Sequence, residues 1–195
     1  SVSQYTIGAD GSLTSMATAT VPAGAEPSSV IVDPSGKYAY VANMGSASVS
    51  QYTIGLNGSL VPMTNTTVAS GTAPYSVTVD PSGKYAYVAT WGTNFNPGVS
   101  QYTIGADGSL APMAAATVAT SVGGNANSVI VDPSGKYAYV ANGFSGNILQ
   151  FTIGANGNLT PMGTPSVLAS GSNALSVTVD PSGKYAYVAN MGSAS

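Results

Sequence analysis

The sequence predicts an all-β protein. It indicates a β-propeller of four-stranded antiparallel blades, with four repeats per chain and a closing blade split into two pairs of strands. Three observations predict this fold: a long internal repeat, short β-branched runs between turn motifs, and chain ends that resemble two halves of one repeat. Repeats of this length are typical of propeller blades and of helical arrays. No segment keeps the 3.6-residue period of a long helix, which excludes the helical array.

Three motifs mark the repeat. The turn motif DPSGK begins at Asp33, Asp80, Asp132 and Asp180, so its copies are 47, 52 and 48 residues apart. The motif QYTIG begins at Gln4, Gln51 and Gln101, and it returns as QFTIG at Gln150. Variants of GSLxPM follow each of them, at residues 11–16, 58–63, 108–113 and 157–162.

One repeat contains the signals for four short strands, as a propeller blade requires. Ser28–Asp33 is a β-branched run, and Lys37–Asn43 alternates with the two-residue period of a strand. Between them, DPSG places Asp, Pro and Gly where a type I turn favours them. Val49–Gly55 alternates again, and the Asn-Gly pair in Leu56–Ser59 indicates a hairpin into the fourth strand, Leu60–Val68.

This pattern predicts a single propeller unit over residues 1–195. The blades are expected at about 28–68, 75–118 and 127–168, with a closing blade made from 1–21 and 174–195. Closing the ring removes unpaired strand edges, which otherwise promote aggregation. The two halves are expected to meet between two chains, as an eight-bladed homodimer, or alternatively within one chain, as a four-bladed monomer. A fragment of a longer ring stays open as a third possibility.

The composition excludes several classes of function. The chain has four Lys, no Arg, no His and no Cys, and only 6% of its residues are charged. Nucleic-acid binding needs a basic surface that this chain lacks, and no apolar run has the length of a membrane span. Imidazole and thiolate metal sites and ordinary catalytic triads are excluded, so no metal and no cofactor are expected. The low-charge surface, rich in Ser, Thr and Asn, favours an extracellular or cell-surface location without fixing the compartment.

The motifs DPSGKYAYVAN, VSQYTIG and GSLxPM resemble the YVTN-type repeat of the lactonase-like β-propeller family, and the resemblance covers all four repeats. It implies a propeller fold, which forms seven-bladed rings in that family. It also implies enzymes that open sugar lactones or form muconolactones with His, Arg and Glu on one face. This sequence has no His or Arg, and Glu26 is its only Glu.

Loops on one face of the predicted propeller differ between repeats, whereas the turns on the other face are nearly invariant. Loops carry function more often than their scaffold does. Thr90–Gly98 is the longest loop of its kind and contains the only Trp of the chain. The candidate ligand-binding residues are Trp91, Asn94, Phe95, Asn96, Tyr75 and Phe144. They are interpreted as a stacking and hydrogen-bonding patch for a neutral ligand such as a carbohydrate; packing of Trp91 against the next blade is the favoured alternative.

The complete repeat and the missing catalytic side chains predict a protein that is not an enzyme. The expected function is a scaffold, or a binding and assembly module, whose variable loop face is the binding side. The alternatives are a lactonase-like enzyme whose catalytic blades are absent from this chain, and an engineered propeller. No catalytic residue is assigned.

Overall fold

The structure of the chain is a computed structural model that describes residues 1–92, 97–120, 124–168 and 172–192. Within these ranges, the chain forms β-strands joined by short connections and one 3₁₀ turn, η1 (Met44–Ser46). Three four-stranded antiparallel sheets lie in the middle of the chain, and a two-stranded sheet lies at each end. We name these sheets the first half-blade, blades 1 to 3 and the last half-blade.

The strands follow the repeat. The first half-blade consists of β1 (Val2–Ile7) and β2 (Leu13–Val21). Blade 1 consists of β3 (Pro27–Val32), β4 (Tyr38–Asn43), β5 (Ser48–Ile54) and β6 (Leu60–Ala69). Blade 2 consists of β7 (Pro74–Val79), β8 (Tyr85–Thr90), β9 (Gly98–Ile104) and β10 (Leu110–Ala119). Blade 3 consists of β11 (Ala126–Val131), β12 (Tyr137–Asn142), β13 (Asn147–Ile153) and β14 (Leu159–Leu168). The last half-blade consists of β15 (Ala174–Val179) and β16 (Ala186–Asn190).

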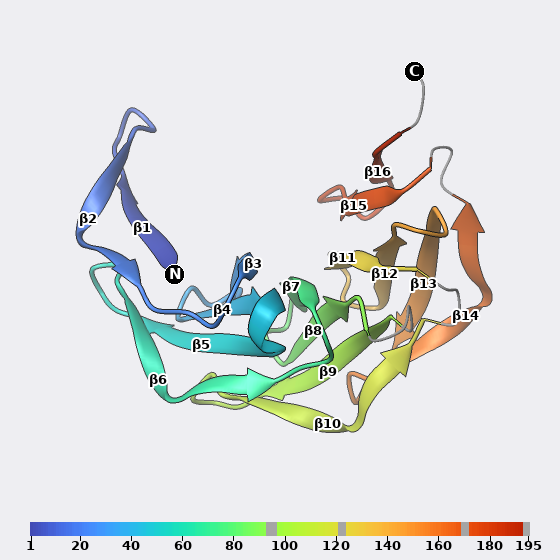
Figure 1. Ribbon diagram of the computed structural model, residues 1–195, viewed down its shortest axis with the longest axis horizontal. Coiled ribbons are helices and arrows are strands. Elements are labelled where there is room, and N and C mark those ends of the chain that lie inside the picture. Colours follow the sequence, from blue (N-terminus) through green and yellow to red (C-terminus); the bar gives the residue numbers. More distant parts are fainter. Residues whose placement is uncertain (93–96, 121–123, 169–171, 193–195) are drawn as a thin grey trace.

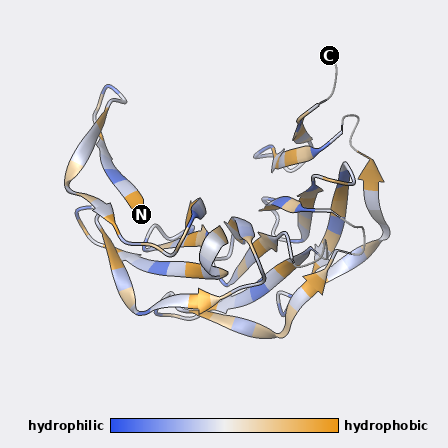
Figure 2. Ribbon diagram, in the orientation of Figure 1, coloured by the Kyte–Doolittle hydropathy of each residue, from blue (hydrophilic) through white to orange (hydrophobic). Residues whose placement is uncertain are grey.

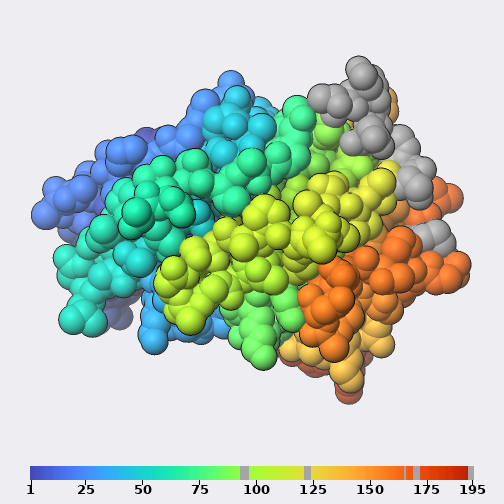
Figure 3. Space-filling view, turned by 90° about the horizontal axis from the view of Figure 1, so that it is seen from below, coloured from blue at the N-terminus to red at the C-terminus, as the bar shows by residue number. Residues whose placement is uncertain are grey.

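The blades stand side by side in an open arc (Figure 1). The first strands of successive sheets, β3, β7, β11 and β15, contact one another in sequence and form the inner side of the arc. The fourth strands, β6, β10 and β14, form the outer side. Seen from the outer side, the blades follow one another in chain order (Figure 3). The first and last half-blades lie at opposite ends of the arc.

The second strand of a blade is buried on both of its faces, because a blade packs on each side of it. Side chains alternate between the faces of a strand, so β4 uses large residues on one face and small ones on the other. Tyr40 packs against Val77 and Leu110 of blade 2. Ala39 packs in a cluster that includes Val21 of the first half-blade. Figure 2 shows that hydrophobic and hydrophilic residues follow one another along the strands of the blades.

A glutamine joins each blade to its neighbour. The ladder between β5 and β6 shifts register at Gln51, where β6 bulges away from its partner. The Gln51 amide donates to the Asn65 carbonyl at 2.9 Å, inside this bulge, and its Oε1 accepts from the Leu110 N–H of blade 2 at 2.6 Å. Gln101 repeats both bonds in blade 2, with the Ala115 carbonyl and the Leu159 N–H, each at 2.7 Å.

The structure confirms the predicted all-β architecture with its four-stranded antiparallel sheets. The two half-blades are not joined to each other: β1 pairs with β2, and β15 pairs with β16. The number of blades in a closed ring and the homodimer stay predictions. Among the described residues, no helix has the length and apolar character to cross a membrane.

Candidate functional site: the loop face at the inner end of the blades

The two faces of the arc differ in chemistry. The turns that join first to second strands and third to fourth strands lie on one face, which we call the turn face. The connections from second to third strands, and from one blade to the next, lie on the other, which we call the loop face. Six of the seven acidic residues and all four Lys of the sequence belong to motifs of the turn face, and the remaining acid, Glu26, lies between β2 and β3 on the loop face.

The turn-face aspartates are held by their own turns. Asp33 Oδ1 accepts from the backbone N–H groups of Lys37 and Tyr38 at 2.9 and 2.8 Å, and its Oδ2 accepts from the Ser35 N–H and hydroxyl. Burial acts to raise the pKa of Asp33, but these hydrogen bonds to the ionised form outweigh it and hold that pKa below its usual value. Asp80, Asp132 and Asp180 make the same bonds. These carboxylates stabilise the turn and are not placed for catalysis.

Two of the predicted ligand-binding residues meet on the loop face. The rings of Tyr75 and Trp91 stack with their centroids 4.9 Å apart and an angle of 17° between their planes. Trp91 Nε1 donates to Asn127 Oδ1 at 3.0 Å, and Asn127 Nδ2 donates to the Ala174 carbonyl at 3.0 Å. Trp91 therefore contacts the next blade, as the packing alternative states, and remains partly exposed in its stack with Tyr75. Asn127 is a site residue that the sequence reasoning missed.

The remaining predicted residues divide into two groups. Phe144 lies in the connection between β12 and β13 and is 75% exposed. It follows Gly143, where an added Cβ would lie 2.4 Å from Asn127 Nδ2, so the backbone next to Phe144 passes close to the residue that binds Trp91. Asn94, Phe95 and Asn96 lie outside the described residues. The role of these candidates in binding a ligand stays a prediction.

Glu26 occupies a position at which the other repeats have an uncharged residue. It directly precedes β3, the inner strand of blade 1, and its φ is 51°, in the left-handed region. Its carbonyl accepts from the Met44 N–H at 2.8 Å, as the carbonyl of Ala73 accepts from Trp91 and that of Asn173 accepts from Met191. The Ala73 copy shows that this turn needs no carboxylate. A left-handed conformation costs a residue with a Cβ about 1–2 kcal/mol.

The surroundings of Glu26 leave its carboxylate accessible. Glu26 is exposed, and its Cδ lies 3.1 Å from where a Cβ on Gly45 would stand, so the glycine of η1 leaves room for it. Because the inner strands begin on this face, Glu26 lies at the inner end of blade 1. Sequence reasoning missed it as a site residue, although its replacement by Ala, Asn and Asn in the other repeats was the available signal.

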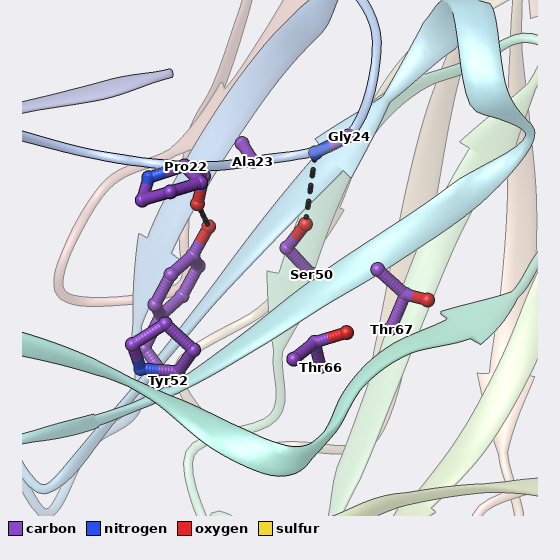
Figure 4. A pocket seen from close by; sticks show the side chains of 8 residues that line it. Pro22, Ala23, Gly24, Ser50, Tyr52, Thr66 and Thr67 are labelled. Carbon is purple, nitrogen blue, oxygen red and sulfur yellow. Dashed lines mark hydrogen bonds between the residues drawn. The ribbon is translucent and has the colours of Figure 1, made fainter.

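A groove of about 200 Å³ lies between the connection from β2 to β3 and strands β5 and β6 of blade 1 (Figure 4). Tyr52 donates its hydroxyl to the Pro22 carbonyl at 2.6 Å, and the Gly24 N–H donates to Ser50 Oγ at 3.2 Å. Blade 2 repeats both bonds with Tyr102 and Ser100. Burial raises the pKa of Tyr102 to about 12, so its hydroxyl remains a donor. A contact repeated at successive junctions is structural, and we assign this groove to blade packing.

Solved structures similar to this chain are bacterial propellers. A putative 6-phosphogluconolactonase from Bacteroides fragilis has 26% sequence identity and a TM-score of 0.77 over 95% of this chain and 56% of that one. A putative 6-phosphogluconolactonase from Bacteroides uniformis has 21% identity and a TM-score of 0.78 over 95% and 56%. The periplasmic gluconolactonase of Pseudomonas aeruginosa has 21% identity and a TM-score of 0.77 over 93% and 55%. This chain thus spans about half the length of the solved structures that it matches. The comparison with curated proteins gave no match.

These comparisons correct the expected function. The expectation that this chain is a scaffold and not an enzyme is wrong, because the matching family and the similar structures point to a lactonase-like enzyme. The absence of His and Arg does not exclude hydrolysis, because a positioned carboxylate alone can act as a general base. The recognised resemblance to lactonase-like propellers is confirmed. The family described as lactonase, 7-bladed beta-propeller, matches residues 1–195, and the chain belongs to it.

Proposed function

We propose that this chain forms part of the ring of a sugar-lactone hydrolase. Such an enzyme opens a cyclic ester with water and yields the corresponding hydroxy acid. The membership in the lactonase family supports this proposal, and so do the names of the similar solved structures. The single observation that carries it at the level of residues is Glu26, a carboxylate at the inner end of the loop face in a turn that needs none.

Glu26 would act as the general base. Its carboxylate takes a proton from a water molecule while the water oxygen attacks the lactone carbonyl. The bond from the carbonyl carbon to the ring oxygen then breaks, and the proton passes to that oxygen, which leaves as a hydroxyl group. A positioned general base contributes about 10²–10⁴-fold to such a reaction. An exposed carboxylate suits the role, since the attacking water comes from solvent.

The chemistry of the loop face favours an uncharged sugar lactone over a phosphorylated one. All four Lys follow the DPSG turns on the turn face, and the chain has no Arg or His. A phosphate group is commonly bound by Arg or Lys side chains, which this loop face does not provide. The stacked pair of Tyr75 and Trp91 and the exposed Phe144 offer aromatic surface suited to a sugar ring.

A substitution of Glu26 tests the proposal. With glucono-δ-lactone as substrate, we expect Glu26→Gln to lower kcat by at least about 10²-fold, because the amide cannot accept the proton. Asp10→Asn is the matched control, since it removes one carboxylate from an exposed position of the turn face, and it should leave kcat unchanged. Acid release in a pH-stat measures turnover, and 6-phosphogluconolactone in place of the neutral lactone tests the substrate class. A wild-type rate equal to spontaneous hydrolysis, or a full rate in Glu26→Gln, would overturn the proposal.

The arc needs further blades to become a closed ring. We propose that a second copy of the chain supplies them, which gives eight blades in all, in preference to closure of the four-bladed monomer. The position of the two half-blades at opposite ends of the arc supports this choice. Eight blades subtend about 45° each and seven about 51°, by division of the circle, so the two curvatures are close.

A further inference from the structure

The two ends of the arc expose side chains that are buried at the equivalent positions of blade 2. Tyr187 on β16 is 61% exposed, whereas the corresponding Tyr87 in blade 2 is fully buried. Leu13 on β2 is 64% exposed, whereas the corresponding Leu110 is 7% exposed. Because the sequence at these positions is the same, the difference arises from a missing neighbouring sheet and not from residue type.

A groove also lies at each end of the arc. A groove of about 420 Å³ opens between blade 3 and the last half-blade, and Tyr139, Gln150 and Val188 line it. A groove of about 310 Å³ opens at the other end, and Ser3 and Val30 line it. Both grooves lie where an interior blade would have its neighbour. The exposed edge of β16 adds unpaired backbone groups, which are a ready template for another strand.

The interior junctions show which groups would fill these grooves. Tyr40 donates its hydroxyl to the Gly108 carbonyl of the next blade at 2.7 Å, and Tyr87 donates to the Gly157 carbonyl. The next tyrosine in this series is Tyr139, and the next glycine in the same turn motif is Gly11 of the first half-blade. The series therefore continues from blade 3 to a hairpin with the sequence of β1–β2.

Two further series continue in the same way. Gln51 and Gln101 accept from the N–H groups of Leu110 and Leu159, and the next pair is Gln150 with Leu13. On the inner strands, Ser76 Oγ accepts from the Val129 N–H, and Ser128 Oγ accepts from the Val177 N–H. The next pair in that series is Ser176 with Val30. One partner with the sequence of this chain thus satisfies both ends of the arc.

From these series we infer that β16 of one chain pairs with β1 of a second copy, and that two such pairings close a ring of two chains. This inference rests on the ring proposed above. Blade 1 supplies the register, because Tyr40 lies opposite Gln51 and Val41 lies opposite Ser50. The corresponding register places Tyr187 opposite Gln4 and Val188 opposite Ser3. The new blade then consists of β15 and β16 of one copy with β1 and β2 of the other.

The mass in solution tests the inference first. Light scattering after size exclusion should give twice 19.2 kDa for the wild-type chain. Leu13→Asp should reduce this to the mass of one chain. The equivalent residues Leu110 and Leu159 are buried between blades, so pairing of two chains would bury the new carboxylate in the same way. Val61→Asp is the matched control. Val61 is 50% exposed, and the equivalent Ala111 stays exposed within the arc, so this variant should keep the wild-type mass.

Cysteine pairing tests the register, since the chain has no Cys of its own. A mixture of Ser3→Cys and Val188→Cys single variants should form a disulfide-linked species of two chains under mild oxidation. A mixture of Ser15→Cys with Val188→Cys should not, because Ser15 lies on β2, away from the paired edge. A wild-type mass of one chain, or open polymers of spreading mass, would overturn the two-chain ring. The mass reports on pairing without substrate, so its failure is distinct from a failure of Glu26 to support turnover.

Discussion

Blade 2 and the last half-blade contain almost the same sequence in different surroundings. The run from Val79 to Ala89 is identical to that from Val179 to Ala189. Tyr87 is fully buried in blade 2, whereas Tyr187 is 61% exposed in the last half-blade. Burial raises the pKa of Tyr87 far above the usual value for tyrosine. The comparison teaches that the sequence of one repeat sets its strands and turns, while the neighbouring blade decides which of its residues form a core.

Removing the buried tyrosine should have the largest effect on stability. Tyr87→Ala should lower the free energy of unfolding by about 3–5 kcal/mol, because it leaves a cavity between blades 2 and 3. Tyr187→Ala should change it by less than about 0.5 kcal/mol at protein concentrations that keep the chains separate. Urea unfolding followed by circular dichroism measures both. Equal losses in the two variants would contradict the difference in burial between the two regions.

The bridging glutamines should show a smaller difference of the same kind. Gln101→Ala leaves the Leu159 N–H and the Ala115 carbonyl without their partner, and it should cost about 2–3 kcal/mol. Gln150→Ala removes the bond to the Thr164 carbonyl in an exposed setting, and it should cost less than about 1 kcal/mol. The same urea titration compares them. If Gln150→Ala were the more damaging variant, the bond between blades would not be the stabilising contact.

Substitution of the turn aspartates should have the smallest effect on stability, and this effect should depend on pH. The pKa of Asp132 is lowered in the folded chain, although burial acts to raise it, because Ser134 and the Tyr137 N–H bind the ionised carboxylate. A carboxyl with a lowered pKa stabilises the fold above its pKa in the unfolded chain, and this stabilisation is lost as pH falls through the folded value.

Asp132→Asn should therefore lower Tm by about 2–4 °C at pH 7, and the difference from wild type should vanish in acid, where both chains lack the charge. Asp180→Asn, in the last half-blade, should give a smaller change at pH 7, since Asp180 is less buried. Differential scanning calorimetry from pH 7 to pH 2 measures both variants. A loss in Asp132→Asn that stayed constant across this range would show that the carboxylate charge does not matter.

Much of the fold was predictable because its signals are local. The strands follow from alternation, and the DPSG turn follows from the known preferences of Asp, Pro and Gly. The bulge opposite Gln51 was not predictable from alternation, since it depends on a side chain that bonds both its own blade and the next one. The strand pattern indicates that Gln51 lies in a strand, and it carries no information about a partner 59 residues away.

The candidate site was predictable only in part. The unusual loop around Trp91 indicated an aromatic patch, but the stacking with Tyr75 depends on how two segments of blade 2 meet, and the bond to Asn127 depends on the position of blade 3. Glu26 was noted as the only Glu of the chain, but it was given no role because the chain lacks the His and Arg that the family uses beside Glu. Comparison with Ala73 and Asn173, which share its left-handed backbone conformation, identifies Glu26 as the one charged residue among the three.

The hydrogen bonds that run from each blade to the next make the molecule a one-dimensional array. In a chain that is not paired with a second copy, every interior unit is stabilised by two neighbours and each terminal unit by one, so local opening should begin at the ends and move inward. Amide exchange would then be fastest in β1 and β16 and slowest in β8. Because every junction uses the same bonds, a gene that gained or lost a whole repeat would create no new kind of contact. The repeat number can thus change during evolution while the junction stays the same.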